Sequence, residues 1–248
     1  LRFWDEACAC HERLGDGPAA FAARVRAFDA ALEAQSPEQA EQRAQALLQH
    51  AADDGQRLDA RLALARSAAA ADRHADALAQ AREAEALALR VEAHGERPRS
   101  LRVSMLLAAA LAGSGQAGAA LELLDRDQGA ILGGGDDRLQ MDCWGMRGYV
   151  SAWAGRFDDA IAAYRQGLVL AERLDDAAEA ATMASNLATA LARQGDCEAA
   201  LRSAQASVLW RRRTGELGSA AGLMAQQVQA MLLLRLGRLG EALTVAEA

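Results

Sequence analysis

Two stretches of the chain repeat one pattern: WGMRGYVSAWAGRFDDAIAAYRQGLVLAERL, residues 144–174, and ASNLATALARQGDCEAALRSAQASVLWRRR, residues 184–213. In each stretch an apolar segment ends at a glycine, Gly155 or Gly195, and a polar pair follows. Glycine directly after a helix adopts the left-handed conformation that ends the helix at little cost. An alanine five residues later is small enough to let a second helix pack closely on the first. Each stretch therefore predicts a helix, a tight turn and an antiparallel helix.

The pattern recurs at a fixed period along most of the chain. Its turn glycines are Gly115, Gly155, Gly195 and Gly237, at spacings of 40, 40 and 42 residues. Each is followed five residues later by an alanine and preceded seven residues earlier by another small residue: Ala120, Ala160, Ala200 and Ala242; Ala108, Gly148, Ala188 and Ala230. Asp72, with Ala65 and Ala77, fits the same template without the glycine. Self-similarity at this length predicts a solenoid of stacked helical units.

These residues make the chain resemble the tetratricopeptide repeat (TPR) family, strongly from about Asp59 onward. The repeat period of this chain is longer than that of the family, which usually repeats about every 34 residues. About six extra residues lengthen the two helices together by roughly 9 Å. Long-period repeats of this kind occur in bacterial signalling proteins. The resemblance implies an all-α, right-handed superhelical solenoid of antiparallel helix pairs.

Residues 1–55 match the template poorly, since Phe28 occupies a small site. We expect them to form degenerate N-terminal helices that cap the array, and residues 56–248 to form about five repeats, the last truncated. Ser36 is expected to cap the helix that starts at Pro37. The expected helices span residues 1–14, 19–34, 37–52, 56–71, 75–93, 99–112, 116–132, 137–154, 157–174, 177–193, 197–213 and 217–236, with a last one from 238.

Composition supports an all-helical fold. The chain has 63 alanines in 248 residues and only 14 valines, isoleucines and threonines together, too few β-branched residues for a sheet. The net charge of −7 argues against a nucleic-acid-binding surface. All 27 basic residues are arginine, which excludes a P-loop lysine and a Schiff-base lysine within these residues. No apolar run approaches the roughly 18 residues that span a membrane. Four scattered cysteines favour a reducing compartment, and we expect a cytoplasmic protein.

Chemical motifs are weak. Cys8, Cys10 and His11 lie close together, but Cys8 and Cys10 point to different faces of a helix, so we expect no metal. The glycines at 133–135 follow no strand and are read as a turn rather than a phosphate-binding loop. Cys143 and Cys197 are expected to be small structural thiols. We expect no catalytic residues, no cofactor and no enzymatic activity in this segment.

The binding residues follow from the resemblance. In the family, the first helix of each repeat lines a concave groove, at positions 10, 9, 6 and 2 residues before the turn. Projected onto this chain, the expected groove residues are Arg66, Met105, Met146, Tyr149, Trp153, Asn186, Thr189, Arg193, Gln227, Met231 and Arg235. Aromatic side chains supply contact area and arginines bind carboxylates. The alternative, that Met146, Tyr149 and Trp153 belong to the core between helices, stays open.

The function expected is a non-catalytic module that binds a protein or peptide segment and no nucleic acid or membrane. The resemblance suggests the regulatory or sensory segment of a larger bacterial signalling protein, either a GGDEF-type diguanylate cyclase or a LuxR-type regulator. The alternatives are a free-standing scaffold and a solenoid that senses a small ligand or peptide. We also expect the chain to continue beyond Ala248 into an effector domain. An apolar face at 239–245 then lacks a neighbour, and in isolation the segment could form a weak homodimer there.

Overall fold

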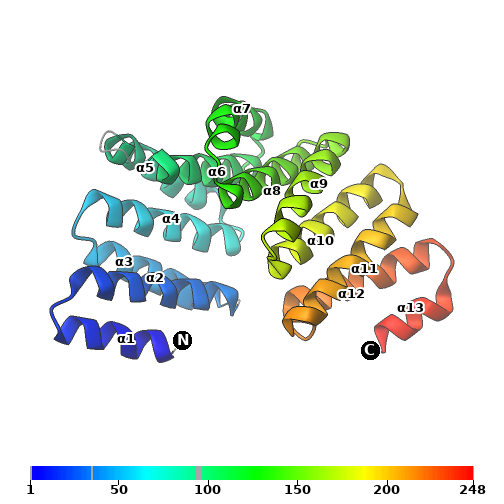
Figure 1. Cartoon of the computed structure of the whole chain (residues 1–248), viewed down its shortest axis with the longest axis horizontal. Coiled ribbons are helices and arrows are strands. Elements are labelled where there is room, and N and C mark those ends of the chain that lie inside the picture. Colours follow the sequence, from blue (N-terminus) through cyan, green and yellow to red (C-terminus); the bar gives the residue numbers. More distant parts are fainter. Residues whose placement is uncertain (1, 35, 93–96, 248) are drawn as a thin grey trace. The chain divides into compact units, whose positions relative to one another are not determined.

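The computed structural model describes residues 2–34, 36–92 and 97–247, and within these ranges every regular element is an α-helix (Figure 1). The prediction of an all-α fold is confirmed. Thirteen helices are described: α1 (Arg2–Arg13), α2 (Gly17–Glu33), α3 (Pro37–His50), α4 (Asp54–Ala70), α5 (His74–Glu92), α6 (Arg97–Gly113), α7 (Ala117–Gly133), α8 (Asp137–Trp153), α9 (Phe157–Arg173), α10 (Ala177–Gln194), α11 (Cys197–Thr214), α12 (Ala220–Arg235) and α13 (Leu239–Ala246). The predicted bounds agree with these to within three residues. Within the described ranges, no helix is both long and apolar enough to cross a membrane.

The chain forms two compact units, residues 1–120 and 121–248, and the boundary falls inside α7. In the first unit, consecutive helices from α1 to α6 pack on one another, and α4 also contacts α2 and α6. Its leading part has a core of its own around Phe28 and Leu47. The proposed separation of a capping segment, residues 1–55, from the repeats stays a prediction.

In the second unit the helices pack as consecutive antiparallel pairs, α8 with α9 and α10 with α11, and α10 also contacts α8, α9 and α12. One continuous core runs through these helices from Met141 on α8 to Ala242 on α13. Helix α10 lies at the centre of this packing, which fixes the side chains that it presents on its remaining face. The hand of the expected superhelix stays a prediction.

The turns have the predicted conformation. Gly115, Gly155, Gly195 and Gly237 have φ angles of 80, 73, 102 and 74°, in the left-handed region that favours glycine. Asp72, which replaces the glycine in the earlier template, adopts the same conformation with a φ of 55°. Aspartate is among the few other residues that visit this region, because its short side chain bonds locally. The template therefore extends one period back, as predicted.

The small positions are where helices touch. Ala120, Ala160 and Ala200 are completely buried, and Ala242 is 4% exposed. At Gly148 on α8, an added Cβ would lie 2.5 Å from a ring carbon of Tyr164 on α9. Only glycine fits there without moving the ring, since real Cβ atoms do not approach so closely. The small residues that recur along the sequence therefore mark the places where neighbouring helices touch.

Ser36 precedes α3 at the predicted position, but its side chain makes no capping hydrogen bond, so the prediction that this side chain caps the helix is wrong. The fixed φ of Pro37 already suits the first turn of the helix. Five aspartates cap other helices instead, each accepting a hydrogen bond from the backbone N–H three residues on: Asp16, Asp53, Asp136, Asp176 and Asp196. Residue 93, the predicted end of the helix that begins at residue 75, lies outside the described residues.

The face predicted to lack a neighbour is open in the structure. Leu239 and Leu243 on α13 are 66% and 60% exposed, while Ala242 packs into the core. The weak homodimer expected through this face stays a prediction.

Candidate functional site

The second unit holds a pocket of about 430 Å³ between α8, α9 and α10. It is lined by Tyr149, Ala152, Trp153, Phe157, Tyr164, Asn186, Thr189, Ala190 and Arg193. Five of these, all except Ala152, Phe157, Tyr164 and Ala190, were expected from the sequence as groove residues. The structure therefore brings the predicted residues of two consecutive repeats into one hollow.

Helix periodicity explains why these five side chains meet. Tyr149 and Trp153 are four residues apart on α8 and so lie one above the other on the same face. Asn186, Thr189 and Arg193 are spaced by three and four residues on α10, which gives that helix one polar face. The Tyr149 and Trp153 rings have centroids 6.1 Å apart and are tilted by 58°. Both faces line the pocket.

Trp153 is 53% exposed, which excludes the alternative that this residue belongs to the core, while its role in binding stays a prediction. A tryptophan of the core would be buried, since its indole carries one of the largest apolar surfaces of any side chain. Tyr149 is half-buried. The aromatic wall thus offers open apolar area, together with polar tips, to whatever enters the pocket.

Two aromatic residues of the lining were not predicted. Phe157 opens α9, and Tyr164 lies two turns further along the same helix. Tyr164 is 2% exposed and packs against Gly148, and its burial raises the pKa of its hydroxyl, so that it stays neutral. Tyr164 could have been predicted only by pairing a large residue on the second helix with Gly148 on the first.

Arg193 is the one charged side chain of the lining. It lies in the last turn of α10, at the pocket's polar wall. Next to it, Gln194 donates a hydrogen bond to the carboxylate of Asp158 on α9, which ties the end of α10 to the start of α9. The Thr189 hydroxyl donates to the Ser185 carbonyl at 3.1 Å, and its oxygen can still accept. The wall combines a cation, an amide and a hydroxyl, groups that bind peptide carbonyls and carboxylates.

Nothing in the lining is arranged for covalent chemistry. Cys143, on the same helix as Tyr149, is 3% exposed, and burial raises the pKa of its thiol to about 11. A thiol in that state is a poor nucleophile at neutral pH. Among the described residues, no group of three or more histidines, cysteines and acids is arranged to hold a metal ion.

The remaining predicted groove residues lie elsewhere. Met105 is only 5% exposed, so its prediction as a binding residue is wrong, because it packs in the core. Arg66 pairs with Asp29 at 2.9 Å and stacks over the Phe28 ring. Met105 and Arg66 both belong to the first unit. The others, Met146, Gln227, Met231 and Arg235, belong to the second unit but do not line this pocket, and their role in binding stays a prediction.

Solved structures of other proteins share this arrangement of helices. No family model matches the sequence, and no curated protein matches it. Solved structures do match. A kinesin light chain of Podosopora anserina with nearly identical TPR-like repeats is similar at 18% identity and a TM-score of 0.62, over 79% of this chain and 94% of that one.

The chain has the TPR-like repeat fold.

Two further TPR-type structures are similar. The signal transduction ATPase PH0952 from Pyrococcus horikoshii, which carries a tetratricopeptide repeat sensor, has a TM-score of 0.70 at 13% identity, over 91% of this chain and 36% of that one. NprR in complex with its cognate peptide NprX has a TM-score of 0.64 at 15% identity, over 92% of this chain and 65% of that one. This chain therefore spans about two thirds of NprR and about a third of PH0952. At these identities the similarity concerns the fold.

Proposed function

We propose that this TPR-like segment is a non-catalytic binding module, and that it holds a peptide or a protein segment in the pocket between Tyr149, Trp153 and Arg193. The pocket carries the proposal. Two predicted helix faces converge on it, one aromatic and exposed, the other polar with a single cation. The fold supports it too, because NprR, a protein of the same fold, binds a peptide.

The chemistry of the walls suggests how a segment binds. An apolar side chain lies against Trp153 and Tyr149, and the arginine pairs with a carboxylate, either of an acidic residue or of a chain terminus. The amide of Asn186 both donates and accepts, so it can bond a peptide unit in an extended backbone. A pocket of this volume holds one or two side chains of a longer segment.

We further propose that this segment has a regulatory or sensory role in a larger bacterial signalling protein, with a GGDEF-type cyclase or a LuxR-type regulator as the effector. It is supported by the long repeat period and by the fold shared with the repeat sensor of PH0952. A cytoplasmic location belongs to this proposal.

Peptide selection tests the module. A displayed library of random peptides is selected on the purified chain, and the recovered peptides are then measured on variants. We expect Asn186→Ala with Arg193→Ala to weaken binding about tenfold or more, because a charge-assisted bond and a backbone bond are both lost. Arg165→Ala is the matched control, an exposed arginine of α9 outside the pocket. Equal binding by the double variant and the control would reject this pocket.

A further inference from the structure

The Tyr164 hydroxyl is a part of the second-unit pocket that the proposed function does not use. Tyr164 is 2% exposed, and among the described residues none forms a hydrogen bond with its oxygen. Buried hydroxyls usually have a partner, because an unpaired one loses its bonds to water without replacement. This oxygen is not among the polar atoms that are both sealed from solvent and unpaired, such as Ser151 Oγ, so it reaches the open space of the pocket.

Packing rather than hydrogen bonding fixes the position of this hydroxyl. The Tyr164 ring lies against Gly148 on α8, where an added Cβ would come within 2.5 Å of it. Burial of the ring, together with the nearby Tyr149, raises the pKa of the hydroxyl above its ordinary value, so that it stays protonated at neutral pH. The group is therefore a neutral hydroxyl that can donate one hydrogen bond into the pocket.

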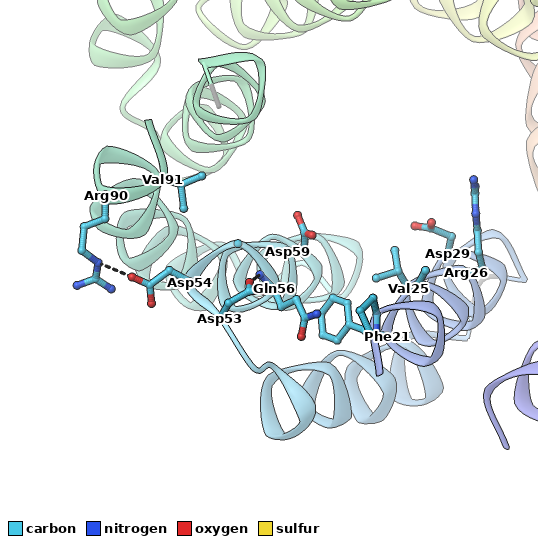
Figure 2. A pocket seen from close by; sticks show the side chains of 13 residues that line it. Phe21, Val25, Arg26, Asp29, Asp53, Asp54, Gln56, Asp59, Arg90 and Val91 are labelled. Atoms are coloured by element: carbon cyan, nitrogen blue, oxygen red, sulfur yellow. Dashed lines mark hydrogen bonds and ion pairs between the residues drawn. The ribbon is translucent and has the colours of Figure 1, made fainter. Parts of the chain in front are cut away.

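A larger pocket in the first unit differs in this respect. It has a volume of about 690 Å³ and is formed by α2, the start of α4 and the end of α5 (Figure 2). Two of its aspartates have partners within the protein. Asp53 accepts a hydrogen bond from the Gln56 N–H at 2.7 Å. Asp54 pairs with Arg90 at 3.0 Å, as the dashed line in Figure 2 marks. These groups are engaged without a ligand, whereas the Tyr164 hydroxyl is not.

A hydrogen-bond acceptor lies near this donor. The Thr189 hydroxyl on α10 donates to the Ser185 carbonyl at 3.1 Å, so its oxygen is left to accept. Met183 on α10 packs against Gly167 on α9, which places these two points level with each other. Tyr164 lies one turn from that level and Thr189 nearly two turns. Because α9 and α10 are joined by a short turn and run antiparallel, both steps lead in the same direction, and about 4.5 Å of helix rise separates the two groups.

A donor and an acceptor at this separation select a group that carries both. A carboxamide has a carbonyl oxygen for the Tyr164 hydroxyl and an NH₂ group for the Thr189 oxygen. A carboxylate offers Thr189 no donor, and it loses its hydration in exchange for neutral partners only. An aliphatic side chain satisfies neither group. The chemistry of these two residues thus favours a neutral amide.

We propose that Tyr164 is a specificity-determining residue of this pocket, and that its hydroxyl selects a peptide segment in which the inserted residue is asparagine or glutamine. The carboxamide accepts from Tyr164 and donates to Thr189. Asn186 and Arg193 remain for the backbone and for a carboxylate elsewhere in the segment. This assignment rests on the function proposed for the pocket.

The test starts from a displayed library of random twelve-residue peptides, selected on the full chain. A recovered peptide is synthesised with glutamine, glutamate or methionine at the enriched position, three side chains of nearly the same shape, and its binding is measured by fluorescence anisotropy. The key variant is Tyr164→Phe, which keeps the ring on Gly148 and removes only the hydroxyl. Ser151→Ala is the matched control, because it removes another buried and unpaired hydroxyl, on α8 and outside the pocket lining.

We expect glutamine or asparagine to be enriched at one position of the recovered peptides. Tyr164→Phe should bind the glutamine peptide about three- to thirtyfold more weakly than the wild-type chain does, because the carbonyl oxygen of the ligand loses its donor. It should bind the methionine peptide as the wild type does, and Ser151→Ala should bind both peptides as the wild type does. Tyr164→Phe should melt at the same temperature or higher, since its folded state has lost an unpaired hydroxyl, which separates lost recognition from a lost fold.

Peptides that require Asn186 and Arg193 but bind Tyr164→Phe as tightly as the wild type would overturn this assignment and leave the proposed function standing. Recovered peptides without an enriched carboxamide would do the same. A selection that recovers no peptide would overturn both. A glutamate peptide that binds the wild-type chain more tightly than the glutamine peptide would assign the position to a carboxylate and contradict the proposed class.

Discussion

Replacing Gly148 with alanine is a direct test of how the repeats pack. The new methyl group would lie 2.5, 2.6 and 2.8 Å from three ring carbons of Tyr164, a residue that is 2% exposed. Because carbon atoms pack at about 3.5–4.0 Å, the ring or α8 must move by about 1 Å. Such overpacking costs about 1–3 kcal/mol, against which alanine recovers up to about 1 kcal/mol of helix propensity.

We therefore expect Gly148→Ala to lower the free energy of unfolding by about 1–2 kcal/mol, measured by urea denaturation followed by circular dichroism. Gly129→Ala is the control, since this helical glycine of α7 has no atom within 4 Å of an added Cβ. It should gain about 0.5–1 kcal/mol. If Gly148→Ala were as stable as the Gly129→Ala control, α8 and α9 would not approach as closely as described, and the packing argument would be refuted.

Three further predictions follow from single residues. Ala200→Leu should destabilise the fold by about 1–3 kcal/mol in the same assay, because this completely buried site has no room for a larger side chain, and an unchanged urea midpoint would contradict the packing. Asp175→Gly should stabilise it by about 0.5–1 kcal/mol, because Asp175 has a φ of 52°; a loss of stability would contradict this. Burial raises the folded-state pKa of the Cys143 thiol from the ordinary value of 9.0 to about 11, so the unfolded chain loses this proton first and stability should fall as pH rises from 9 to 11. Between pH 8 and pH 10.5 the loss due to Cys143 should be about 2 kcal/mol, and Cys143→Ala, which cannot ionise, should lack it.

The helices and their turns were predictable because their causes are local in the sequence. Gly155 and Gly195 end helices through their own backbone freedom, and Ala160 and Ala200 mark contacts between helices that are adjacent in the chain. The capping aspartates could also have been read locally. Ser36 could not, since whether a hydroxyl turns toward the N–H or toward water depends on its surroundings.

The pocket in the second unit was predictable in part. The face of α10 with Asn186 and Arg193 follows from helical spacing alone. Phe157 and Tyr164 enter the lining from the second helix of the pair, where only the three-dimensional contact with Gly148 reveals them. The same limit explains Met105: spacing places it on the groove side of its helix, but its burial depends on which neighbouring helix covers it.

Binding of a peptide carboxylate by Arg193 can be measured with a double-mutant cycle followed by calorimetry. One step is Arg193→Ala, and the other replaces the carboxylate of a selected peptide by the matching amide. If the guanidinium binds that carboxylate, the two changes should be coupled by about 1–3 kcal/mol, whereas Arg165→Ala should show no coupling to the peptide. Additive effects of Arg193→Ala and the amide, for every acidic peptide that the chain selects, would contradict the binding of a peptide carboxylate by Arg193.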